Sequence, residues 1–313
     1  MKISLAPMAG VTDAAFRILT REVTGTRSLM FSEMISSTGI HYRNDKTLEM
    51  LSIIDAERPI AIQLFGSKPA YVREAVGYVS TLEGVSAIDF NMGCPAPKIV
   101  KNGEGSALMN EPALVEELIT TMRRSTTLPL GVKMRLGFDR INAVEIARIV
   151  EGCGADWITV HGRTRLQFYS GRADWNEIAK VKAAVTIPLI ANGDVRDFDT
   201  FDEIMHVTGA DGVMVGRGAL GNPWLLGRLE HYVETGERLP PPSLEERIKV
   251  MRRHLDLLIG FKGERVGIRE MRKHAAWYTK GMIGGALLRD QFNRAESRAD
   301  FISIIDNNFF KAD

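Results

Sequence analysis

The stretch Ala87–Pro95, with the sequence AIDFNMGCP, decides how this chain is interpreted. Its apolar start has the pattern of a short buried strand, and that strand ends at Asn91. Cys94 follows between a glycine and a proline, which place it on a tight turn at the strand end. A side chain in that position projects into a cleft, although an ordinary buried cysteine is the alternative for a single thiol. The rest of the sequence decides between the two.

Seven further segments have the same strand pattern, short and apolar or β-branched between turn residues. The eight predicted strands are Ile3–Met8, Leu29–Met34, Ile60–Phe65, Ala87–Asn91, Leu130–Leu136, Trp157–His161, Pro188–Asn192 and Gly212–Gly216. Most gaps hold a predicted helix, namely Ala14–Glu22, Pro69–Thr81, Pro112–Arg124, Ala143–Gly152, Trp175–Ala184 and Thr200–Val207. Strands that alternate with helices over about 220 residues predict an α/β protein with a closed (β/α)8 TIM barrel. A doubly wound open sheet is the alternative.

The pattern changes after the eighth strand. Pro240–Pro242 is a stiff break, and Ser243 with Glu246 has the spacing of a capping box that opens a helix. Apolar residues then recur every three or four positions, as on an amphipathic helix. We therefore expect a barrel domain in residues 1–238 and a small all-helical domain in residues 243–313.

The composition is that of an ordinary soluble enzyme, with 45% hydrophobic and 25% charged residues among 313. No apolar run approaches the roughly 18 residues of a membrane span, and the N-terminus lacks the pattern of a secretory signal. The two cysteines, Cys94 and Cys153, provide neither a disulfide framework nor a C-x-x-C metal site. The sequence therefore predicts a cytoplasmic protein without a metal or a membrane span, and a monomer is the default expectation.

The net charge of +1 hides an uneven distribution. Residues 243–313 hold 14 Lys/Arg and 10 Asp/Glu, whereas residues 1–242 hold 26 and 29. Within the basic tail, the segment Arg265–Lys280 mixes several cations with Trp277 and Tyr278. Such a mixture suits phosphate contacts together with base stacking. A solvated helix face with docked aromatic residues is the alternative.

Polar residues end most of the predicted strands, at the edge where a barrel of this kind has its active site. They are Glu33, Gln63, Asn91 with Cys94, Lys133 with Arg135, His161, Asn192 with Asp194, and Arg217. Interior positions of a barrel are normally apolar, so buried Gln, Lys and His side chains need partners. A bound ligand is the simplest partner.

The segments after the last two strands, Ala191–Asp194 and Val215–Gly218, indicate the kind of ligand. Each has a glycine where the backbone can approach a group closely, and Arg217 adds a cation. Because phosphate sites in these barrels are typically built from these two loops, a phosphorylated cofactor is indicated. A tight turn with Arg217 paired to a carboxylate is the alternative.

The side chains of Lys133 and His161 leave three interpretations open. They suit a Schiff-base lysine with a general base, or two donors to a flavin ring. In the third interpretation, Lys133 forms an ion pair inside the barrel and His161 is a core histidine.

Together these motifs resemble the tRNA-dihydrouridine synthases over the whole length of the chain. The most specific is NMGCP at residues 91–95, followed by Lys98 and by GSAL at 105–108. The others are APMAGVTD at 6–13, SEM at 32–34, QLFG at 63–66, KMR at 133–135, HGRT at 161–164, NGD at 192–194 and GRG at 216–218. The tail RKHAAWY at 272–278 is similar to the helical domain of the bacterial B-type members.

The resemblance implies an FMN enzyme that uses NADPH to reduce the C5–C6 double bond of particular uridines in tRNA. It implies that Cys94 is the general acid, which gives a proton to C5 while flavin N5 delivers hydride to C6. An ordinary thiol pKa of about 8.5 leaves such a cysteine able to donate at neutral pH. The implied FMN-binding residues are Pro7, Met8, Ala9, Gln63, Lys133, His161, Asn192, Gly193, Asp194, Gly216 and Arg217.

The resemblance also implies substrate-binding residues. Asn91 and Arg163 are expected at the uracil edge, and Arg272 and Lys273 are expected to bind tRNA phosphates. Three rival interpretations stay open: a flavin barrel that acts on a free pyrimidine or small enone, a Schiff-base aldolase or lyase that uses Lys133, and a tRNA-binding protein without catalysis. Similarity to the B type suggests one D-loop uridine as the target, with ribosomal RNA as an open alternative.

Overall fold

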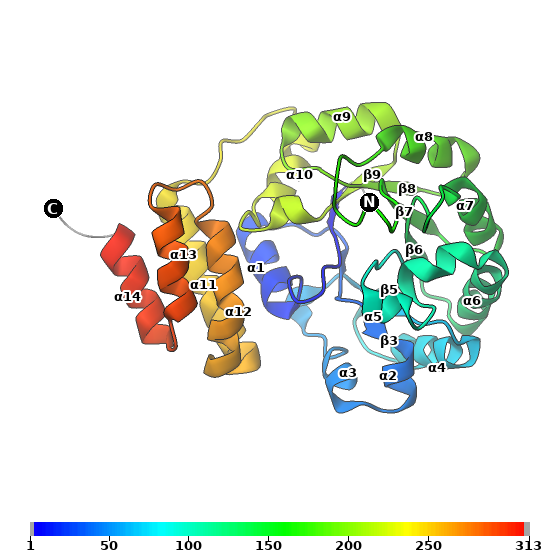
Figure 1. Ribbon diagram of the computed structural model, residues 1–313, viewed down its shortest axis with the longest axis horizontal. Helices are drawn as coiled ribbons and strands as arrows, with labels where there is room; N and C mark the ends of the chain where they lie inside the picture. Colours follow the sequence, from blue (N-terminus) through cyan, green and yellow to red (C-terminus); the bar gives the residue numbers. More distant parts are fainter. Residues whose placement is uncertain (1–2, 310–313) are drawn as a thin grey trace. The chain divides into compact units, whose positions relative to one another are not determined.

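A parallel β-barrel forms the core of one part of the protein, and the computed structural model describes residues 3–309. Its strands are β1 (Ile3–Leu5), β2 (Met30–Phe31), β3 (Ile35–Ser36), β4 (Ile60–Phe65), β5 (Val85–Met92), β6 (Leu130–Arg135), β7 (Trp157–His161), β8 (Leu189–Asn192) and β9 (Gly212–Val215). They pair in the order β1-β9-β8-β7-β6-β5-β4-β2, and β3 also pairs with β4. Because β1 in turn contacts β2, the sheet is a nearly closed barrel (Figure 1). The predicted TIM barrel is confirmed, and the open sheet is wrong.

Helices follow the strands of the barrel as the sequence predicts. The long ones are α4 (Pro69–Ser80), α6 (Pro112–Ser125), α7 (Ala143–Gly152), α8 (Trp175–Ala184) and α9 (Phe198–Thr208), and the short ones are α2 (Ser37–His41), α3 (Asp45–Glu49) and α5 (Pro97–Val100). Proline in the first turn begins α4 and α6, where its missing N–H has no helical partner to lose. The bounds of α7 and α8 agree with the prediction residue for residue.

The second strand of the barrel differs from the prediction, which had one strand over Leu29–Met34. The structure has two short strands there, β2 and β3, and both pair with β4. The register advances from Met30 to Ile35 on one side and from Ile60 to Leu64 on the other. Five residues therefore oppose four, and the extra residue interrupts the strand as a bulge.

The described chain forms two compact units. The first comprises the residues up to Asp13 together with Arg27–Arg217, and it contains all the strands. The second comprises Ala14–Thr26 and the residues from Gly218 onwards. Its helices are α1 (Ala14–Thr24), α10 (Leu225–Thr235), α11 (Leu244–Lys262), α12 (Glu264–Tyr278), α13 (Gly285–Arg294) and α14 (Arg298–Phe309). Among these helices α1 is unexpected, because it follows the first barrel strand in the sequence.

Packing explains why α1 belongs to the second unit. Its apolar side chains Ala15, Ile18 and Leu19 are part of the same hydrophobic core as Ile248 and Leu255 of α11. The helix α11 begins in the predicted capping box, in which Ser243 Oγ accepts from Glu246 N (3.2 Å) and Glu246 Oε2 accepts from Ser243 N (2.7 Å).

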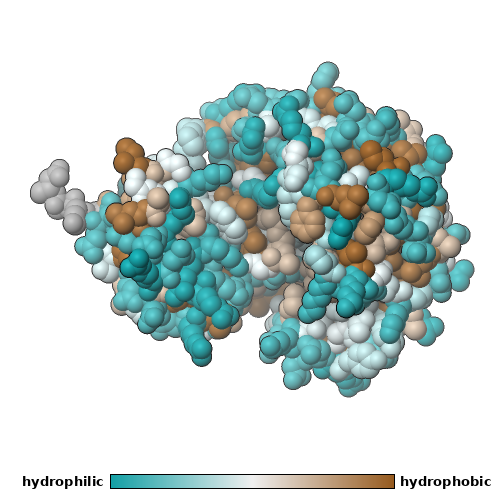
Figure 2. Space-filling view, in the orientation of Figure 1, coloured by the Kyte–Doolittle hydropathy of each residue, from teal (hydrophilic) through white to brown (hydrophobic). Residues whose placement is uncertain are grey.

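The visible surface is mostly hydrophilic. Figure 2 shows hydrophilic residues over most of this face, with hydrophobic residues in small separate groups. Among the helices of residues 3–309, none has the length and apolar character needed to cross a membrane.

Gly131 on β6 leaves room for the Trp157 indole on β7, since a Cβ at this glycine would lie 2.1 Å from Trp157 Cε2. We expect Gly131→Ala to lower the free energy of unfolding by about 1–3 kcal/mol, because the indole packs in a hydrophobic layer and has to shift. Urea unfolding measures the change. Gly77→Ala on α4 is the control: its Cβ would meet nothing within 4 Å, so we expect a gain of about 0.5–1 kcal/mol. Equal destabilisation of both variants would contradict this explanation.

Candidate active site

The structure brings the predicted strand-end residues together at one edge of the barrel. The register between neighbouring strands places Asn91 beside Lys133, Arg135 beside His161, and His161 beside Asn192. Parallel strands end at the same edge of the sheet, and in these barrels that edge carries the active site. The side chains therefore form a group of polar residues at the edge where a ligand is expected.

A hydrogen-bond chain runs from a buried carboxyl group to the turn that carries Cys94. Asp89 on β5 accepts from Gln63 Nε2 on β4 (2.6 Å), and Gln63 Oε1 accepts from Asn91 Nδ2 (2.8 Å). Asn91 Oδ1 then accepts from the backbone N–H groups of Gly93 (3.1 Å) and Cys94 (2.9 Å). Because Asp89, Gln63 and Asn91 are all buried, each partner fixes the orientation of the next.

The turn after β5 is also held from its other side. Ser106 donates its N–H (3.0 Å) and its Oγ–H (2.9 Å) to the carbonyl oxygen of Cys94. Gly105 has a φ of +59°, and a Cβ there would come within 2.8 Å of the same carbonyl, so the close approach requires glycine. The half-buried Cys94 thus has both its N–H and its carbonyl in fixed positions.

Burial raises the pKa of the Cys94 thiol, although a backbone hydrogen bond at Ala96 and the charges of Arg135 and Lys133 oppose this rise. The thiol is therefore protonated at neutral pH. The same two cations would stabilise the thiolate once the proton had left. These properties suit an acid that donates a proton better than a nucleophile that rests as thiolate.

Lys133 lies beside the end of β8, where its Nζ donates to Asn192 Oδ1 (3.2 Å). Asn192 Nδ2 donates to Met214 O (2.7 Å), and this second bond turns the amide oxygen toward Lys133. Burial, reinforced by the charge of Arg135, lowers the pKa of Lys133 to about 8. The amine is therefore mostly, but not wholly, charged at neutral pH.

Arg135 joins two loops of the site. Its Nε donates to Gly93 O (2.7 Å) in the Cys94 turn, and its Nη1 donates to Thr164 O (3.0 Å) and Phe168 O (2.8 Å) after β7. Burial lowers the pKa of Arg135 to about 10, which still leaves it charged at neutral pH. The sequence predicts a polar group at this strand end but not its role, because its partners are backbone carbonyls that no motif identifies.

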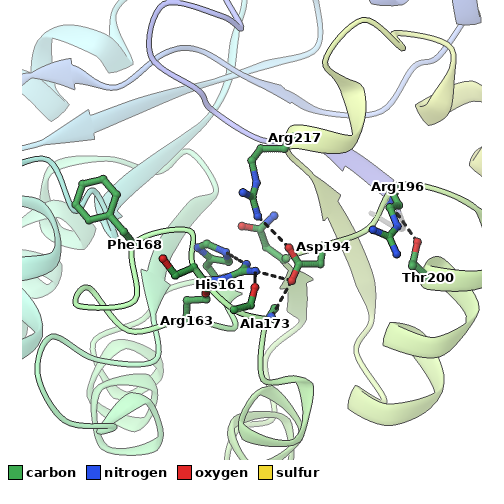
Figure 3. A network of polar contacts seen from close by, with 12 residues as sticks. His161, Arg163, Phe168, Ala173, Asp194, Arg196, Thr200 and Arg217 are labelled. Carbon is green, nitrogen blue, oxygen red and sulfur yellow. Dashed lines mark hydrogen bonds and ion pairs between the residues drawn. The ribbon is translucent and has the colours of Figure 1, made fainter. Parts of the chain in front are cut away.

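Figure 3 shows a second network, centred on Asp194, whose φ of +61° is uncommon for a residue other than glycine. Its carboxylate accepts from Arg163 Nη2 (2.6 Å), Ala173 N (2.7 Å) and Arg217 Nη2 (3.0 Å). Burial alone would raise the pKa of Asp194, but these hydrogen bonds and the two arginine charges together lower it. An ionised carboxylate thus connects the loops that follow β7, β8 and β9.

Arg163 is fully buried in this network. Its guanidinium also donates to Ser170 O (3.1 Å) and Gly171 O (2.7 Å), and its Nη1 lies 3.3 Å from His161 Nε2. Burial, reinforced by Lys133 and the neighbouring arginines, lowers the pKa of His161 well below its ordinary value, so the imidazole is neutral. With Nε2 as the acceptor from Arg163, the proton of the ring is on Nδ1.

Tyr169 is a residue of the site that the sequence analysis missed. Its ring is 51% exposed and lies between two guanidinium groups, those of Arg135 (5.6 Å) and Arg217 (5.0 Å). Cation–π contacts of this kind contribute about 0.5–1 kcal/mol at exposed positions. No sequence signal marks the residue, because only the folded chain brings the two arginines to the tyrosine.

The remaining predicted residues of this edge lie at the ends of β1 and β8. Met8, flanked by Pro7 and Ala9, approaches the end of β9, since a Cβ at Gly216 would lie 3.9 Å from Met8 Sδ. Gly193 has a φ of +132°, and Trp175 Nε1 donates to its carbonyl (3.1 Å). Within the described residues, no group of three or more His, Cys, Asp or Glu side chains could hold a metal ion.

The parallel barrel with its flanking helices places the protein in the class of TIM-barrel enzymes, and its polar residues lie at the edge where these enzymes have their active site. Among solved structures, the histamine dehydrogenase from Rhizobium sp. 4-9 has a TM-score of 0.54 and 12% identity, over 82% of this chain and 49% of that one. This likeness shows the fold alone.

Sequence comparison identifies the family within this class. The family model described as dihydrouridine synthase matches residues 4–312. The chain is 42% identical over 308 residues to "Probable tRNA-dihydrouridine synthase 1" of Synechocystis sp., which covers 97% of this chain and 85% of that one. It is 41% identical over 298 residues to "tRNA-dihydrouridine synthase B" of Xanthomonas axonopodis, which covers 95% and 89%.

The chain belongs to the dihydrouridine synthase family. Membership makes it a flavin-dependent oxidoreductase. Two interpretations left open by the sequence are therefore wrong, the Schiff-base aldolase or lyase and the RNA-binding protein without catalysis.

Asp89 predicts a pH dependence of stability. Burial raises its pKa to about 7, although the hydrogen bond from Gln63 and the charge of Lys133 oppose the rise. An aspartate in the unfolded chain titrates near pH 3.9, so between about pH 4 and 7 the folded state binds the additional proton. The contribution of Asp89 to the free energy of unfolding therefore falls as pH rises through this range.

We expect Asp89→Asn to remove this part of the pH dependence, so that the wild type loses stability relative to the variant as pH rises. Urea unfolding of both proteins between about pH 5 and 8 measures the difference. A difference that stays constant with pH would show that Asp89 does not titrate in this range.

Proposed function

We propose that this protein is a tRNA-dihydrouridine synthase that uses FMN and NADPH to reduce the C5–C6 double bond of a uridine in tRNA. The observation that carries the proposal is a protonated thiol, Cys94, on a turn held from both sides at the carboxyl edge of a barrel of this family. The names of the Synechocystis and Xanthomonas relatives specify tRNA for those proteins. We extend that substrate class to this chain.

A flavin bound at this edge and reduced by NADPH would supply the hydride for C6 of the uracil. Cys94 Sγ–H donates the proton to C5, and the two additions together saturate the double bond. The charges of Lys133 and Arg135, which act against the raised pKa of Cys94, favour the thiolate that remains. The Asn91 amide keeps the sulfur in place during the transfer, because it holds the N–H of Cys94 itself.

The residues at the strand ends fit a flavin with a phosphate. We propose that Gln63, Lys133 and His161 would contact the ring system and that Pro7, Met8 and Ala9 would also help to hold it. The phosphate would be held by Asn192–Asp194 with Gly216 and Arg217. Two observations support this assignment. The side chain of Arg217 is 49% exposed although it is paired with Asp194, and an added Cβ at Gly216 would meet only ordinary van der Waals contacts.

We propose positioning roles for the two residues that were predicted to contact the uracil edge. Asn91 uses its amide to accept from the Cys94 turn and to donate to Gln63. Arg163 is 1% exposed, and its guanidinium is directed at Asp194, at backbone carbonyls and at His161. These internal contacts support a role in which Asn91 holds the Cys94 turn and Arg163 holds His161. They give less support to direct recognition of the base by either side chain.

Cys94→Ala tests the acid role. A general acid contributes about 10²- to 10⁴-fold, so we expect dihydrouridine formation to slow by at least about 100-fold. Flavin absorption and tRNA affinity should stay close to the wild-type values. Cys153→Ala is the matched control, because that thiol lies at the end of α7 and faces Glu116 O (3.7 Å), and it should keep full activity. Full activity of Cys94→Ala would refute the role.

A basic groove on the second unit supports a site for the tRNA backbone. The cavity measures about 550 Å³ and is lined by Arg265, Val266, Ile268, Arg269, Arg272 and Glu296. Arg265 and Arg269 are exposed and lie four residues apart, on one face of α12. Arg272 has a structural contact as well, since its Nη2 donates to Ala295 O (2.8 Å) at the end of α13.

We propose that residues 243–313 bind tRNA phosphates through this groove and through Arg272 and Lys273, whereas the barrel strands and their loops within residues 1–238 form the FMN-binding catalytic domain. The excess of Lys/Arg in the tail, 14 against 10 Asp/Glu, supports this division of roles. Because Arg272 also holds Ala295, its substitution would change folding together with binding. Arg265 and Arg269 therefore give the cleaner test.

Reversing the charge of both exposed arginines, Arg265→Glu with Arg269→Glu, should weaken tRNA binding at least about tenfold. It should also reduce the slope of log affinity against log salt by about one for each phosphate that the protein no longer neutralises. Fluorescence anisotropy with an unmodified tRNA transcript over a salt series measures both effects. Lys249→Glu on α11 is the control, because this exposed lysine does not line the groove. An equal effect of the control would contradict a localised site.

A further inference from the structure

A partly exposed group of aromatic rings lies on the barrel unit, outside the candidate active site. His41 ends α2, Tyr42 follows it, and Tyr71 is in the first turn of α4. The His41 and Tyr71 rings are stacked, with centroids 3.8 Å apart and an interplanar angle of 14°. Tyr42 meets both rings edge-on, at 4.8 and 5.9 Å, and its phenol oxygen lies 3.2 Å from that of Tyr71. We call these three residues with Lys68 the aromatic platform.

Several contacts hold the aromatic platform together, and part of it is open to solvent. Lys68 Nζ lies 4.8 Å from the centroid of the Tyr71 ring, and His41 Nδ1 lies 2.6 Å from Glu74 Oε2. Tyr42 is nevertheless 67% exposed. Its hydrogen bond with Tyr71 raises the pKa of the Tyr42 phenol, so the ring is neutral. An exposed ring that is already fixed by its neighbours loses little conformational entropy when another flat group stacks on it.

The aromatic platform is carried by helices that follow strands of the same barrel as Cys94. The helices α2 and α4 follow β3 and β4, so they begin at the carboxyl edge of the barrel, and they lie side by side in Figure 1. Ser67, next to Lys68, donates its Oγ–H to Asn102 O (3.2 Å). Asn102 lies in the short segment that joins the Cys94 turn to Ser106. The loop that carries Lys68 and the segment after the Cys94 turn are therefore in contact.

The charge around the aromatic platform favours a polyanion. The segments 41–49, 66–74 and 97–104 contain six Lys/Arg and four Asp/Glu, whereas residues 1–242 as a whole contain 26 and 29. Two of these four carboxylates are already engaged within the protein, because Glu74 contacts His41 and Glu104 is buried. Lys68, Lys98 and Lys101 are exposed. Aromatic rings flanked by lysines are the combination that binds single-stranded nucleic acid, through base stacking and phosphate contacts.

We propose that the aromatic platform is a second RNA-binding site of the protein, in which Tyr42 stacks on an unpaired base of the tRNA and Lys68 contacts a neighbouring phosphate. The proposal rests on the proposed function, because it places part of the same tRNA near Cys94. A protein partner is less well supported, since the rings stand among charged residues and not within an apolar patch.

Tyr42→Ala and Tyr42→Phe test the stacking. Stacking on an aromatic side chain is worth about 1–3 kcal/mol per base, so we expect the alanine variant to bind an unmodified tRNA transcript about tenfold more weakly. Its kcat/KM for dihydrouridine formation should fall by a similar factor. The phenylalanine variant keeps the ring and should stay within about twofold of the wild type. Tyr78→Ala is the matched control, because Tyr78 is a 42% exposed tyrosine on the same helix as Tyr71 and is not part of the aromatic platform.

Two further measurements separate this proposal from the function on which it rests. Flavin reduction by NADPH without tRNA should be the same in all variants, and Lys68→Ala should reduce the salt slope of tRNA binding by about one. If the wild type forms dihydrouridine in tRNA and Tyr42→Ala is as active as Tyr78→Ala, the second site is overturned and the proposed function stands. If Tyr42→Phe loses as much affinity as Tyr42→Ala, the phenol and not the ring is recognised, and stacking is refuted. If the wild type forms no dihydrouridine in tRNA, the proposed function is refuted, and the second RNA-binding site, which rests on it, is refuted with it.

Discussion

The burial of one carboxyl group and two amides inside the barrel is the constraint on which the site depends. An unpartnered polar group in such an interior costs about 1–3 kcal/mol, so Asp89, Gln63 and Asn91 are stable there only as a connected chain. Because Asp89 accepts, Gln63 has to present its Nε2 to the carboxyl group and its Oε1 to Asn91. The oxygen of Asn91 is then left for the backbone of the next turn. The place of Cys94 is therefore determined by the buried strands β4 and β5, although the residue itself lies in a loop.

The same burial controls the charge of the site. Several cations converge at the edge of the barrel, and Asp194 pairs with two of them. Burial and this excess positive charge lower the pKa of both Lys133 and His161. They do not deprotonate the thiol, because the effect of burial on Cys94 exceeds the attraction of the nearby cations for a thiolate. A site with this balance holds a proton on sulfur until an acceptor arrives and then tolerates the anion, which is the behaviour that a general acid needs.

The sequence predicts those features that depend on local pattern. The bounds of α7 and α8, the capping box at Ser243 and the strand-end positions of the site all follow from hydrophobic period and turn residues. The fold class then indicates which edge of the sheet carries the site. Features that depend on distant segments do not follow. The carbonyl contacts of Arg135 and the two arginines beside Tyr169 exist only because particular loops meet. In the same way, the pattern of α1 shows an apolar face but not that this face packs on α11.

The two proposed RNA contacts differ in their physical basis, and that difference explains why an enzyme of this kind would need both. The arginine groove on α12 attracts phosphates, so its contribution weakens as salt rises and depends little on which base is present. A uracil that is reduced must leave its stack, which costs a few kcal/mol at any salt concentration. Binding of phosphates does not compensate specifically for broken stacking, whereas stacking of a base on an aromatic ring does. On this argument Tyr42 offsets part of the cost of opening the tRNA loop, and the groove supplies the general affinity.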